Sequence, residues 1–476
     1  MKKTFLLICL AAVLLSCAKE AINPQEENTR NEGVPMTFNL TVLETKAAKT
    51  DWADGDKIYV FFNGLATKYL TLTYDGSSWS NHAGTLLSTD FDGLKTKTLT
   101  AVHFPVAVDV ACADGKFTFT SGGKPVYTYY LFETGKDYRV DGTTVTATLS
   151  LGKPADMVQI HVAGIQANVS DYTFGCTKIR PVACASVGAD GLITESKLQA
   201  GARLSGFADA DGGIFAGRLE FPGVQKDYKF TLASDEKIYT LTRSGRALTP
   251  GTMYTFPDLS TIGENYWSVT NASDLYVDLG LSVKWAKYNV GADNETDYGD
   301  HFAWGEIQPK IYYYKDFSNY LWGVPGDLIK YIGYTGSDYT VLQKEDDAAY
   351  ADLGGKYRMP TRAEIKELLA TKDNRTDYTW VKCDGKFEKY QDSTVKGWKV
   401  IKNVSGATIF FPCAGIRGDS AIFNLNDKGG YWSSSLYVDV PDFAWGVDFY
   451  SSTNIGTFDE CGAERYFGRS VRPVSD

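Results

Sequence analysis

The residue types that most often carry out chemistry are sparse in this chain and are not grouped by spacing. Its 476 residues include only four histidines, His82, His103, His161 and His301. None stands in an HExxH motif or beside a CxxC pair, so the sequence offers no zinc site. No GxSxG turn, ordered Ser/His/Asp set or GxxxxGK loop is present, which argues against acyl transfer and phosphate binding.

The acidic residues do not suggest catalysis either. The pairs Asp346-Asp347 and Glu26-Glu27 are adjacent in the sequence, whereas glycosidase carboxylates face each other across a substrate. Asp51, Asp54 and Asp56 lack the spacing of an EF-hand and a closing Glu, so we expect a hairpin turn there rather than a calcium site. We therefore expect no enzyme, no metal and no cofactor.

Residues 429–450, GGYWSSSLYVDVPDFAWGVDFY, favour binding instead. Their apolar and aromatic positions are typical of a sheet, whereas their Tyr, Asp and Ser positions are typical of a contact surface. Tyrosine supplies a large rigid contact area, and Asp, Ser and Asn supply adaptable hydrogen bonds. We interpret the stretch as part of a binding face.

A short helix and a sheet are expected to position this face. Thr361 can cap a helix with Glu364 completing a capping box, and Ile365, Leu368 and Leu369 then share one face. We expect this helix to pack on a sheet built from residues 408–411, 443–449 and 470–474. Trp432 and Trp445 are expected in the core. Buried carbonyls are the expected partners of three arginines, Arg358, Arg465 and Arg472.

An ordered series of motifs covers residues 264–476, including YGDHFAWGE, KYRMPTRAEIKELL, TIFFPCAGIRG, GYWSSS and RYFGRSVRPV. The series resembles the Fibrobacter succinogenes major paralogous domain of Bacteroidetes surface lipoproteins and the wider C-type-lectin-like fold. RMPT-x-x-E is similar to the RLPTEAEW motif of formylglycine-generating enzymes, but the cysteines do not match that family's catalytic positions. The calcium and sugar motifs of true C-type lectins are missing. In RGDS, residues 417–420, we expect a framework turn rather than an integrin motif.

In some bacterial and phage proteins of this fold, the final stretch is diversified by a retroelement. Here the resemblance implies a framework of Trp432-SSS, Ala444-Trp445, Phe449, Arg465, Gly468 and residues 471–474. It implies a ligand-binding surface of Tyr437, Asp439, Asp442, Phe443, Asp448, Tyr450, Ser452 and Asn454. An ordinary undiversified surface is the alternative, and under either interpretation this face is expected to bind a ligand.

The first residues indicate export. Two lysines precede an apolar run over residues 5–15, which is too short to span a bilayer and is typical of a signal peptide, here residues 1–16. LLSC follows and resembles a bacterial lipobox, which implies lipidation of Cys17. The polar residues 17–33 are expected to form a flexible tether. The net charge of −10 argues against nucleic acid as a partner.

Export permits disulfides, and an even number of cysteines remains outside the signal peptide and the lipobox. Cys176–Cys184 and Cys413–Cys461 are two candidate pairs. Buried free thiols are the alternative, and the spacing does not choose between them.

Residues 34–260 are expected to form a β-sandwich region. Met36, Phe38, Leu40 and Val42 alternate with polar residues, and short strands separated by turn residues continue to residue 256. The stretch TDWADGDKIYVF at 50–61 resembles the fimbrillin family, the subunits of type V pili of Bacteroidales. In that family a protease cuts after a basic residue beyond the first strand, and a strand from the next subunit fills the groove. Lys46 and Lys49 are the candidate cleavage sites here, with Arg30 as an earlier one; an uncleaved loop is the alternative.

The chain is therefore expected to be mainly β, with one or more fimbrillin-like β-sandwich domains followed by an α+β C-type-lectin-like domain. Two functional hypotheses follow. The first is an adhesin at a pilus tip, anchored by lipid at the outer membrane, that takes up pilus subunits by strand addition and binds a surface glycan or protein. The second is a stand-alone surface lipoprotein that captures such ligands without a pilus. An oxidase of the formylglycine type is a third and weaker hypothesis.

Overall fold

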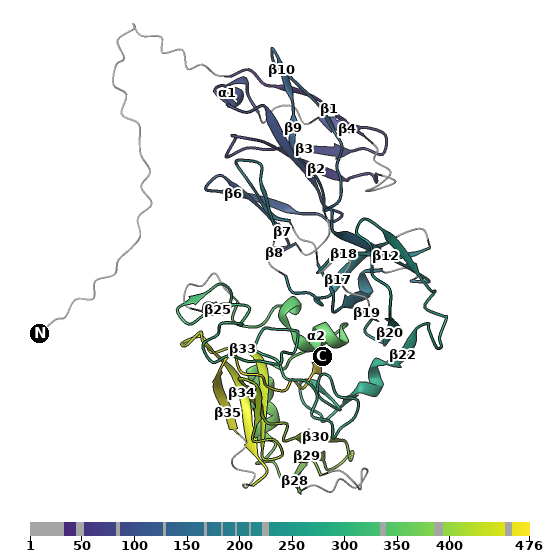
Figure 1. The fold of residues 1–476 in the computed structure, drawn as a ribbon, viewed down its shortest axis with the longest axis vertical. Coiled ribbons are helices and arrows are strands. Elements are labelled where there is room, and N and C mark those ends of the chain that lie inside the picture. The colour runs from purple at the N-terminus through teal and green to yellow at the C-terminus, as the bar shows by residue number, and fades with distance from the viewer. Residues whose placement is uncertain are drawn as a thin grey trace, which may run out of the picture.

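The computed structural model describes residues 33–43, 52–81, 86–126, 130–165, 169–181, 184–195, 198–208, 211–220, 228–333, 339–384, 394–452 and 459–476. The protein is mainly β, as predicted, and its sheets are arranged in three successive units along the long axis (Figure 1). The N-terminal sheets lie at the opposite end of the molecule from the sheet of β33 Lys428–Leu436, β34 Phe443–Tyr450 and β35 Asp459–Glu464. No helix in the described part of the chain has the length and apolarity needed to cross a membrane.

The N-terminal unit encloses the first hydrophobic core with three sheets, in the orders β1-β11-β10, β4-β3-β2-β5-β9 and β16-β15-β7-β6. Its elements are β1 Thr37–Val42, β2 Lys57–Phe62, β3 Leu70–Tyr74, β4 Trp79–Asn81, α1 Ser88–Phe91, β5 Thr98–His103, β6 Asp109–Ala113, β7 Lys116–Ser121, β8 Lys124–Pro125, β9 Leu131–Asp137, β10 Arg139–Asp141, β11 Thr144–Leu149, β15 Cys184–Gly188 and β16 Ile193–Glu195.

The first strand and the first turn confirm their predictions. Met36, just before β1, and Phe38 and Leu40 within it are buried as the alternating pattern predicts, and Val42 is partly buried. The strand pairs in parallel with β11. The residues between Asp51 and the next strand form a turn in which the Asp56 carboxylate accepts a hydrogen bond from Ala53 N at 2.7 Å. Gly55 adopts a φ of 86° there, a conformation that other residues rarely adopt.

The middle unit is one curled sheet in the order β21-β12-β18-β17-β13-β19-β20-β22, around a second core. Its strands are β12 Met157–Ala163, β13 Thr173–Cys176, β14 Ile179–Arg180, β17 Leu204–Ala208, β18 Gly212–Leu219, β19 Tyr228–Ala233, β20 Lys237–Arg243, β21 Met253–Phe256 and β22 Ser268–Asn271.

The predicted limits of the domains are not the limits of the sheets. Residues 34–260 contain two cores, and β12 supplies Met157 to the first and Val158 to the second. β22 lies after residue 264, yet it pairs with β20, and the buried Trp267 belongs to the middle core. The middle sheet therefore ends at Asn271, within the segment predicted to start the C-terminal domain.

The C-terminal unit combines several small sheets with two helices. Its elements are β23 Tyr276–Val277, β24 Lys284–Ala286, β25 Gly323–Val324, β26 Asp327–Leu328, α2 Ala348–Leu353, β27 Tyr357–Arg358, α3 Arg362–Ala370, β28 Tyr378–Asp384, β29 Lys396–Lys402, β30 Thr408–Pro412, β31 Ile416–Gly418, β32 Ala421–Phe423, β33 Lys428–Leu436, β34 Phe443–Tyr450, β35 Asp459–Glu464 and β36 Val474–Ser475.

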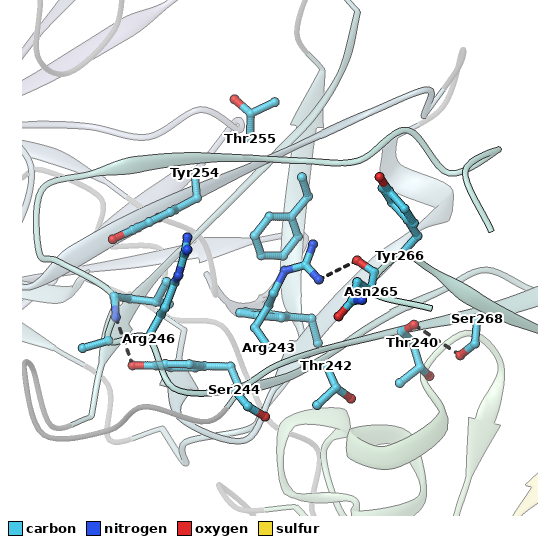
Figure 2. A pocket seen from close by; sticks show the side chains of 15 residues that line it. Thr240, Thr242, Arg243, Ser244, Arg246, Tyr254, Thr255, Asn265, Tyr266 and Ser268 are labelled. Carbon is cyan, nitrogen blue, oxygen red and sulfur yellow. Dashed lines mark hydrogen bonds between the residues drawn. The ribbon is translucent and has the colours of Figure 1, made fainter. Parts of the chain in front are cut away.

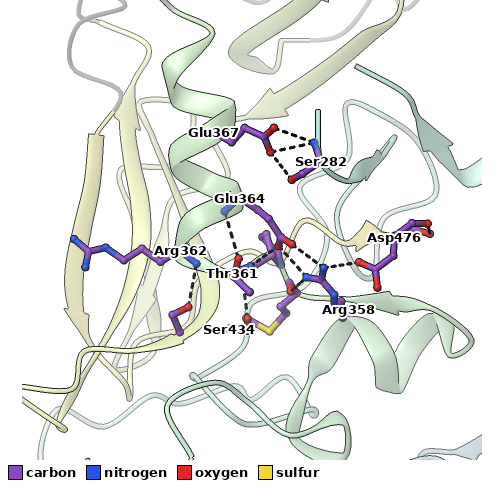
Figure 3. Close-up of polar contacts among 12 residues, drawn as sticks. Ser282, Arg358, Thr361, Arg362, Glu364, Glu367, Ser434 and Asp476 are labelled. Carbon is purple, nitrogen blue, oxygen red and sulfur yellow. Dashed lines mark hydrogen bonds and ion pairs between the residues drawn. The ribbon is translucent and has the colours of Figure 1, made fainter. Parts of the chain in front are cut away.

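The predicted helix is α3, and its capping box is present. Thr361 accepts a hydrogen bond from Glu364 N, and Glu364 accepts one from Thr361 N at 2.7 Å (Figure 3). Burial alone would raise the pKa of Glu364, but the hydrogen bonds from Arg358 and Thr361 lower it. Its apolar residues Ile365, Leu368 and Leu369 are buried together, as predicted.

The single sheet predicted under this helix is wrong. Residues 408–411 belong to the β28-β29-β30 sheet and residues 443–449 to the β33-β34-β35 sheet. The third segment bonds to β33 at Ser470 and contributes Val474 to the β23-β24-β36-β27 sheet. All three still send side chains into the core beneath α3, including Phe411, Phe449 and Val474. The hydrophobic pattern identified a shared core correctly, but it did not show which main chains are hydrogen-bonded to one another.

Arg203 joins the middle unit to the C-terminal unit. Its side chain is 7% exposed and donates to main-chain carbonyls on both sides of the junction. The acceptors are Thr173 and Thr231 in the middle unit and Tyr350, Ala351 and Asp352 on α2. Burial lowers the pKa of Arg203 to about 10, so the guanidinium stays charged at neutral pH and its hydrogen bonds are charge-assisted.

Candidate functional site

Residues of β34 point alternately to the two sides of its sheet, and this divides the predicted ligand-binding residues into two groups. The strand pairs regularly with β35 from Phe443 to Asp448. Phe443 therefore lies on the same side as Trp445, Val447 and Phe449, which is the side of α3. Asp448 and Tyr450 lie on the opposite side, so the predicted residues do not form one continuous face.

On the α3 side, three half-buried rings form what we call the aromatic platform: Tyr437, Phe443 and Trp445. The rings of Tyr437 and Trp445 are stacked, with 4.4 Å between their centres. The platform lies over the exposed Gly462 of β35, where a Cβ atom would come within 2.8 Å of Tyr437. Glycine at this position lets the rings approach the strand closely.

Arg362, the first residue of α3, covers Trp445. Its guanidinium carbon lies 3.4 Å from the ring centre, a cation–π contact. Glu460 on β35 holds the same guanidinium with two hydrogen bonds of 2.8 and 2.9 Å. The hydrogen bond from Arg362 lowers the pKa of Glu460, so this carboxylate stays ionised. Trp445 was predicted to be core, but it is half-buried and belongs to the surface; Trp432 is fully buried, as predicted.

The loop from Tyr437 to Phe443 is held from beneath, so its side chains can face outward. Tyr437 N donates to Phe443 O at 3.1 Å, which closes the loop. The buried Arg465 donates from Nη1 to Pro441 O at 3.0 Å and from its main-chain N to Asp442 O at 2.9 Å. Asp439 is exposed and Asp442 is half-exposed on this loop. Aromatic surface and two carboxylates are thus presented on a fixed main chain.

Asp448 is a structural residue in this arrangement. It forms ion pairs of 2.7 Å with both Lys428 and Arg469. Burial would raise the pKa of Asp448, but the charges of Arg469 and Lys428 outweigh it and lower the pKa. Tyr450 lies beside Lys428 on the same side of the sheet, with 5.4 Å between the amine and the ring centre. Ser452 is exposed further along the chain.

The buried arginines largely match their predicted role. Arg465 and Arg472 are almost fully buried and donate to main-chain carbonyls, as predicted. Arg358 differs because its main partners are carboxylates: it contacts Glu364 at 2.7 Å and the C-terminal residue Asp476 at 2.6 Å (Figure 3). In RGDS, Arg417 and Gly418 end β31, and Asp419 and Ser420 form the predicted turn to β32.

Several predicted sites lie outside the described residues: Cys17, Lys46, Lys49 and Asn454. Lys46 and Lys49 follow β1 directly in the sequence. Within the described residues β1 has one ladder partner, β11, so it is an edge strand. A cut after either lysine would separate β1 from the rest of the chain.

Among the described residues, the cysteines of the two candidate pairs, Cys176, Cys184, Cys413 and Cys461, are unbridged thiols, which is one of the two alternatives left open by the sequence. Cys176, Cys184 and Cys413 are buried, and burial raises the pKa of each to about 12. A thiol with so high a pKa is protonated at neutral pH and is a poor nucleophile. The described residues also contain no group of three or more His, Cys, Asp or Glu placed to hold a metal.

Sequence reasoning missed Arg362, Glu460 and Gly462. Arg362 lies on α3, far from the Tyr437 loop in sequence, and Glu460 and Gly462 lie on the next strand, β35, where no motif marked them. The available signals were the aromatic stretch at residues 429–450 and the arginine at the start of the predicted helix, and the sequence did not connect the two.

No protein-family model and no curated protein matches the chain. Similar solved structures include a candidate cell adhesion protein from Bacteroides ovatus, with 14% identity over 51% of this chain and 96% of that chain and a TM-score of 0.26. A fimbrial protein from Bacteroides ovatus matches 93% of this chain and 99% of its own, with 12% identity and a TM-score of 0.24. The fimbrial anchor protein Mfa2 from Porphyromonas gingivalis matches 42% of this chain and 78% of its own, with 10% identity and a TM-score of 0.22.

These similar structures are named as fimbrial or adhesion proteins. At such low identities and scores they carry no inference about this chain. Its function must be argued from its own residues.

Proposed function

We propose that this protein is a surface adhesin whose C-terminal unit binds a glycan or a protein through the aromatic platform and the loop from Tyr437 to Phe443. The observation that carries the proposal is that half-exposed rings and carboxylates stand on a main chain fixed by the buried Arg465. Rigid aromatic surface beside adaptable polar groups is what binding surfaces use, because little conformational entropy is lost on contact.

The four residues Tyr437, Asp439, Asp442 and Phe443 are the centre of the proposed site. Arg362 positions Trp445, the ring on which Tyr437 stacks. Tyr450, Ser452 and Asn454 would form a separate, secondary contact region. Asp448 is assigned to the fold rather than to the ligand, because both of its oxygens are engaged.

The test uses the chain without residues 1–16, immobilised and probed with a panel of glycans and of host and bacterial surface proteins. Because no metal is expected in the site, specific binding should persist in the presence of a chelator. Binding that disappears with the chelator would contradict the proposed metal-free contact, and a panel without any specific partner would contradict the adhesin itself.

The pilus-associated form of the proposal rests on β1. Removal of β1 would uncover the apolar residues against which Met36, Phe38 and Leu40 pack, next to the free edge of β11. Each of these side chains contributes about 1.5–3 kcal/mol by its burial, so the vacated groove would favour a replacement strand from another subunit. Pilus subunits would be the partners. Lipid on Cys17 would hold the uncut chain at the outer membrane, and a cut after Lys46 or Lys49 would separate the chain from that anchor.

Two measurements separate this form from a stand-alone lipoprotein. The first is the N-terminal sequence of the protein in assembled surface material, which should begin after Lys46 or Lys49. The second uses a synthetic peptide of residues 34–43, which should bind the cleaved chain and raise its melting temperature without affecting the uncleaved chain. An intact N-terminus would favour the stand-alone lipoprotein.

Diversification by a retroelement is a finer part of the proposal. It predicts a second DNA copy of the final coding region with adenines at the codons for Tyr437, Asp439, Asp442 and Phe443. Genome sequencing around the gene tests it, and a region without such a copy supports an undiversified face.

A further inference from the structure

The middle unit contains a groove where its curled sheet does not close. The sheet begins at β21 and ends at β22, and residues of both strands line one cavity of about 890 Å³. Its floor is apolar and includes Tyr228, Phe230 and Phe256. A cavity of this volume is within the range of ligand-binding sites.

Main-chain groups on both sides of the groove lack a neighbouring strand. Within the described residues, β21 pairs with β12 alone. Gln159 N donates to Thr252 O, so Thr252 and Tyr254 face β12, and alternation directs the main-chain groups of Met253 and Thr255 to the open edge. On the other side, β22 pairs with β20 only from Lys237 to Thr240. In the described residues, the following segment of β20 up to Arg243 has no ladder partner on that side.

Large apolar side chains are exposed at the same two edges. Met253 on β21 is 48% exposed, and Val269 on β22 is 41% exposed. Tyr266, which lines the groove, is 48% exposed. Open strand edges with exposed apolar residues promote pairing with another chain, and proteins normally cover or charge such edges.

The groove is positively charged in a chain whose net charge is −10. Its lining includes Arg243 and Arg246 but no Asp or Glu. Figure 2 shows both arginine side chains reaching into the space between Tyr254 on β21 and Tyr266. Arg243 donates to Asn265 O at 2.6 Å, whereas the Arg246 side chain has no hydrogen bond or ion pair with the described residues.

We propose that this groove accepts an extended segment of a partner polypeptide as an added β-strand. The segment would pair with the open edges of β20 and β21, direct alternate apolar side chains onto the floor at Tyr228, Phe230 and Phe256, and place an acidic side chain beside Arg246. The two open edges favour a peptide main chain over other ligands. This groove lies over the middle core and is open while β1 is in place, so the inference does not depend on the proposed function.

The test uses the uncleaved chain and an eight-residue peptide that alternates Val and Thr and carries two Glu residues. Matched peptides with Gln or Lys in place of Glu, and one with a central Pro, are the controls. Affinity is measured by fluorescence anisotropy. The acidic peptide should bind at least about tenfold more tightly than its Gln and Lys versions, and the Pro version should not bind.

Two substitutions separate main-chain pairing from charge attraction. Thr255→Pro removes a main-chain donor at the open edge, where proline is tolerated, and should abolish binding, whereas Thr255→Val keeps the donor and should not. Arg246→Glu should weaken binding at least about tenfold. Melting curves confirm that each variant is folded.

Three outcomes would overturn the inference: no binding of the acidic peptide, equal binding of its Gln version, or binding that survives Thr255→Pro in a folded variant. An oligogalacturonate is tested in parallel. If it binds, and its binding is lost with Arg246→Glu but not with Thr255→Pro, the groove takes an acidic carbohydrate and the strand-acceptor role is refuted. Peptide binding in this assay is independent of ligand binding at the aromatic platform, so one can fail without the other.

Discussion

The guanidinium of Arg362 lies 3.4 Å from the ring centre of Trp445, which joins the first turn of α3 to the middle of β34. Trp445 also stacks on Tyr437, so Arg362 contacts a ring of the aromatic platform that is itself stacked on a second one. The helix that the sequence predicted most clearly therefore positions a residue of the proposed binding surface.

The Arg362–Trp445 contact should be measurable as a coupling energy. In a double-mutant cycle with Arg362→Ala and Trp445→Leu, we expect about 1 kcal/mol of coupling in the free energy of unfolding, the usual range for a partly exposed cation–π pair. Arg362→Lys should recover only part of it, because lysine cannot hold Glu460 with two hydrogen bonds. Additive single-mutant effects would show that the contact does not support the platform.

Arg203 should be essential for the junction between the middle and C-terminal units. Arg203→Ala leaves buried carbonyls on both sides without a donor and should lower the free energy of unfolding by about 3 kcal/mol. Arg203→Lys should cost nearly as much, because one amine cannot reach all the acceptors. The exposed Arg375→Ala is the control and should change stability by less than about 0.5 kcal/mol. Equal effects of Arg203→Ala and the control would contradict the account.

The ion pairs of Asp448 should make stability depend on pH in the acidic range. The pKa of Asp448 is lowered below its ordinary value of 3.8 in the folded protein. Its contribution is therefore present above pH 3.8 and is lost as the pH falls through the lower, folded pKa. Asp448→Asn should cost about 2 kcal/mol at neutral pH and should reduce the loss of stability below pH 3.8.

The Asp448 substitution also tests its assignment to the fold. Unfolding experiments between pH 3 and pH 7 should show the pH effect, while ligand affinity of the folded Asp448→Asn variant at pH 7 should change little. If the Asp448→Asn variant lost much of its ligand affinity without losing stability, Asp448 would belong to the ligand-binding surface after all.

The cysteines should react with a thiol reagent in an order set by their burial. Cys112 is exposed and should be modified first, followed by Cys383 and Cys461, which are partly buried. The buried Cys176, Cys184 and Cys413 should react only on unfolding, since the pKa of each thiol is about 12. Mass spectrometry under non-reducing conditions checks this order, and a disulfide-linked peptide would contradict it.

Local patterns in the sequence predicted much of the fold. The alternation of Met36, Phe38 and Leu40 identified β1, and the spacing of Thr361 and Glu364 identified α3 with its capping box. These features depend on residues a few positions apart, where periodicity and capping determine the local structure. The sequence left open whether the N-terminal region holds one domain or more. The division between its two cores falls within β12, where the neighbouring residues Met157 and Val158 pack into different cores, and only long-range packing determines that.

The binding surface was predicted only in part. Phe443 and Asp448 are an odd number of positions apart, so on a regular strand their side chains point to opposite faces of the sheet. The division of the predicted ligand-binding residues into two groups could therefore have been predicted from the sequence. In contrast, the contacts of Arg362 with Trp445 and of Arg465 with Pro441 join elements that no local pattern relates. The groove beside Arg246 likewise depends on how far the middle sheet curls.

The measurement that tests the central claim most directly is the affinity of the chain for a partner from the binding panel, compared between two fourfold variants. The first variant changes Tyr437, Asp439, Asp442 and Phe443 to Ala. The second changes Ile311, Tyr312, Tyr314 and Phe423 to Ala, a set of more exposed residues elsewhere on the same unit. Melting curves confirm that both are folded.

If the aromatic platform and its loop bind the partner, the first variant should lose at least about thirtyfold in affinity, since hot-spot residues contribute about 2 kcal/mol or more. The second variant should bind as the unmodified chain does. Unchanged affinity in the first variant, or an equal loss in both, would show that the ligand binds elsewhere and would contradict the proposed site.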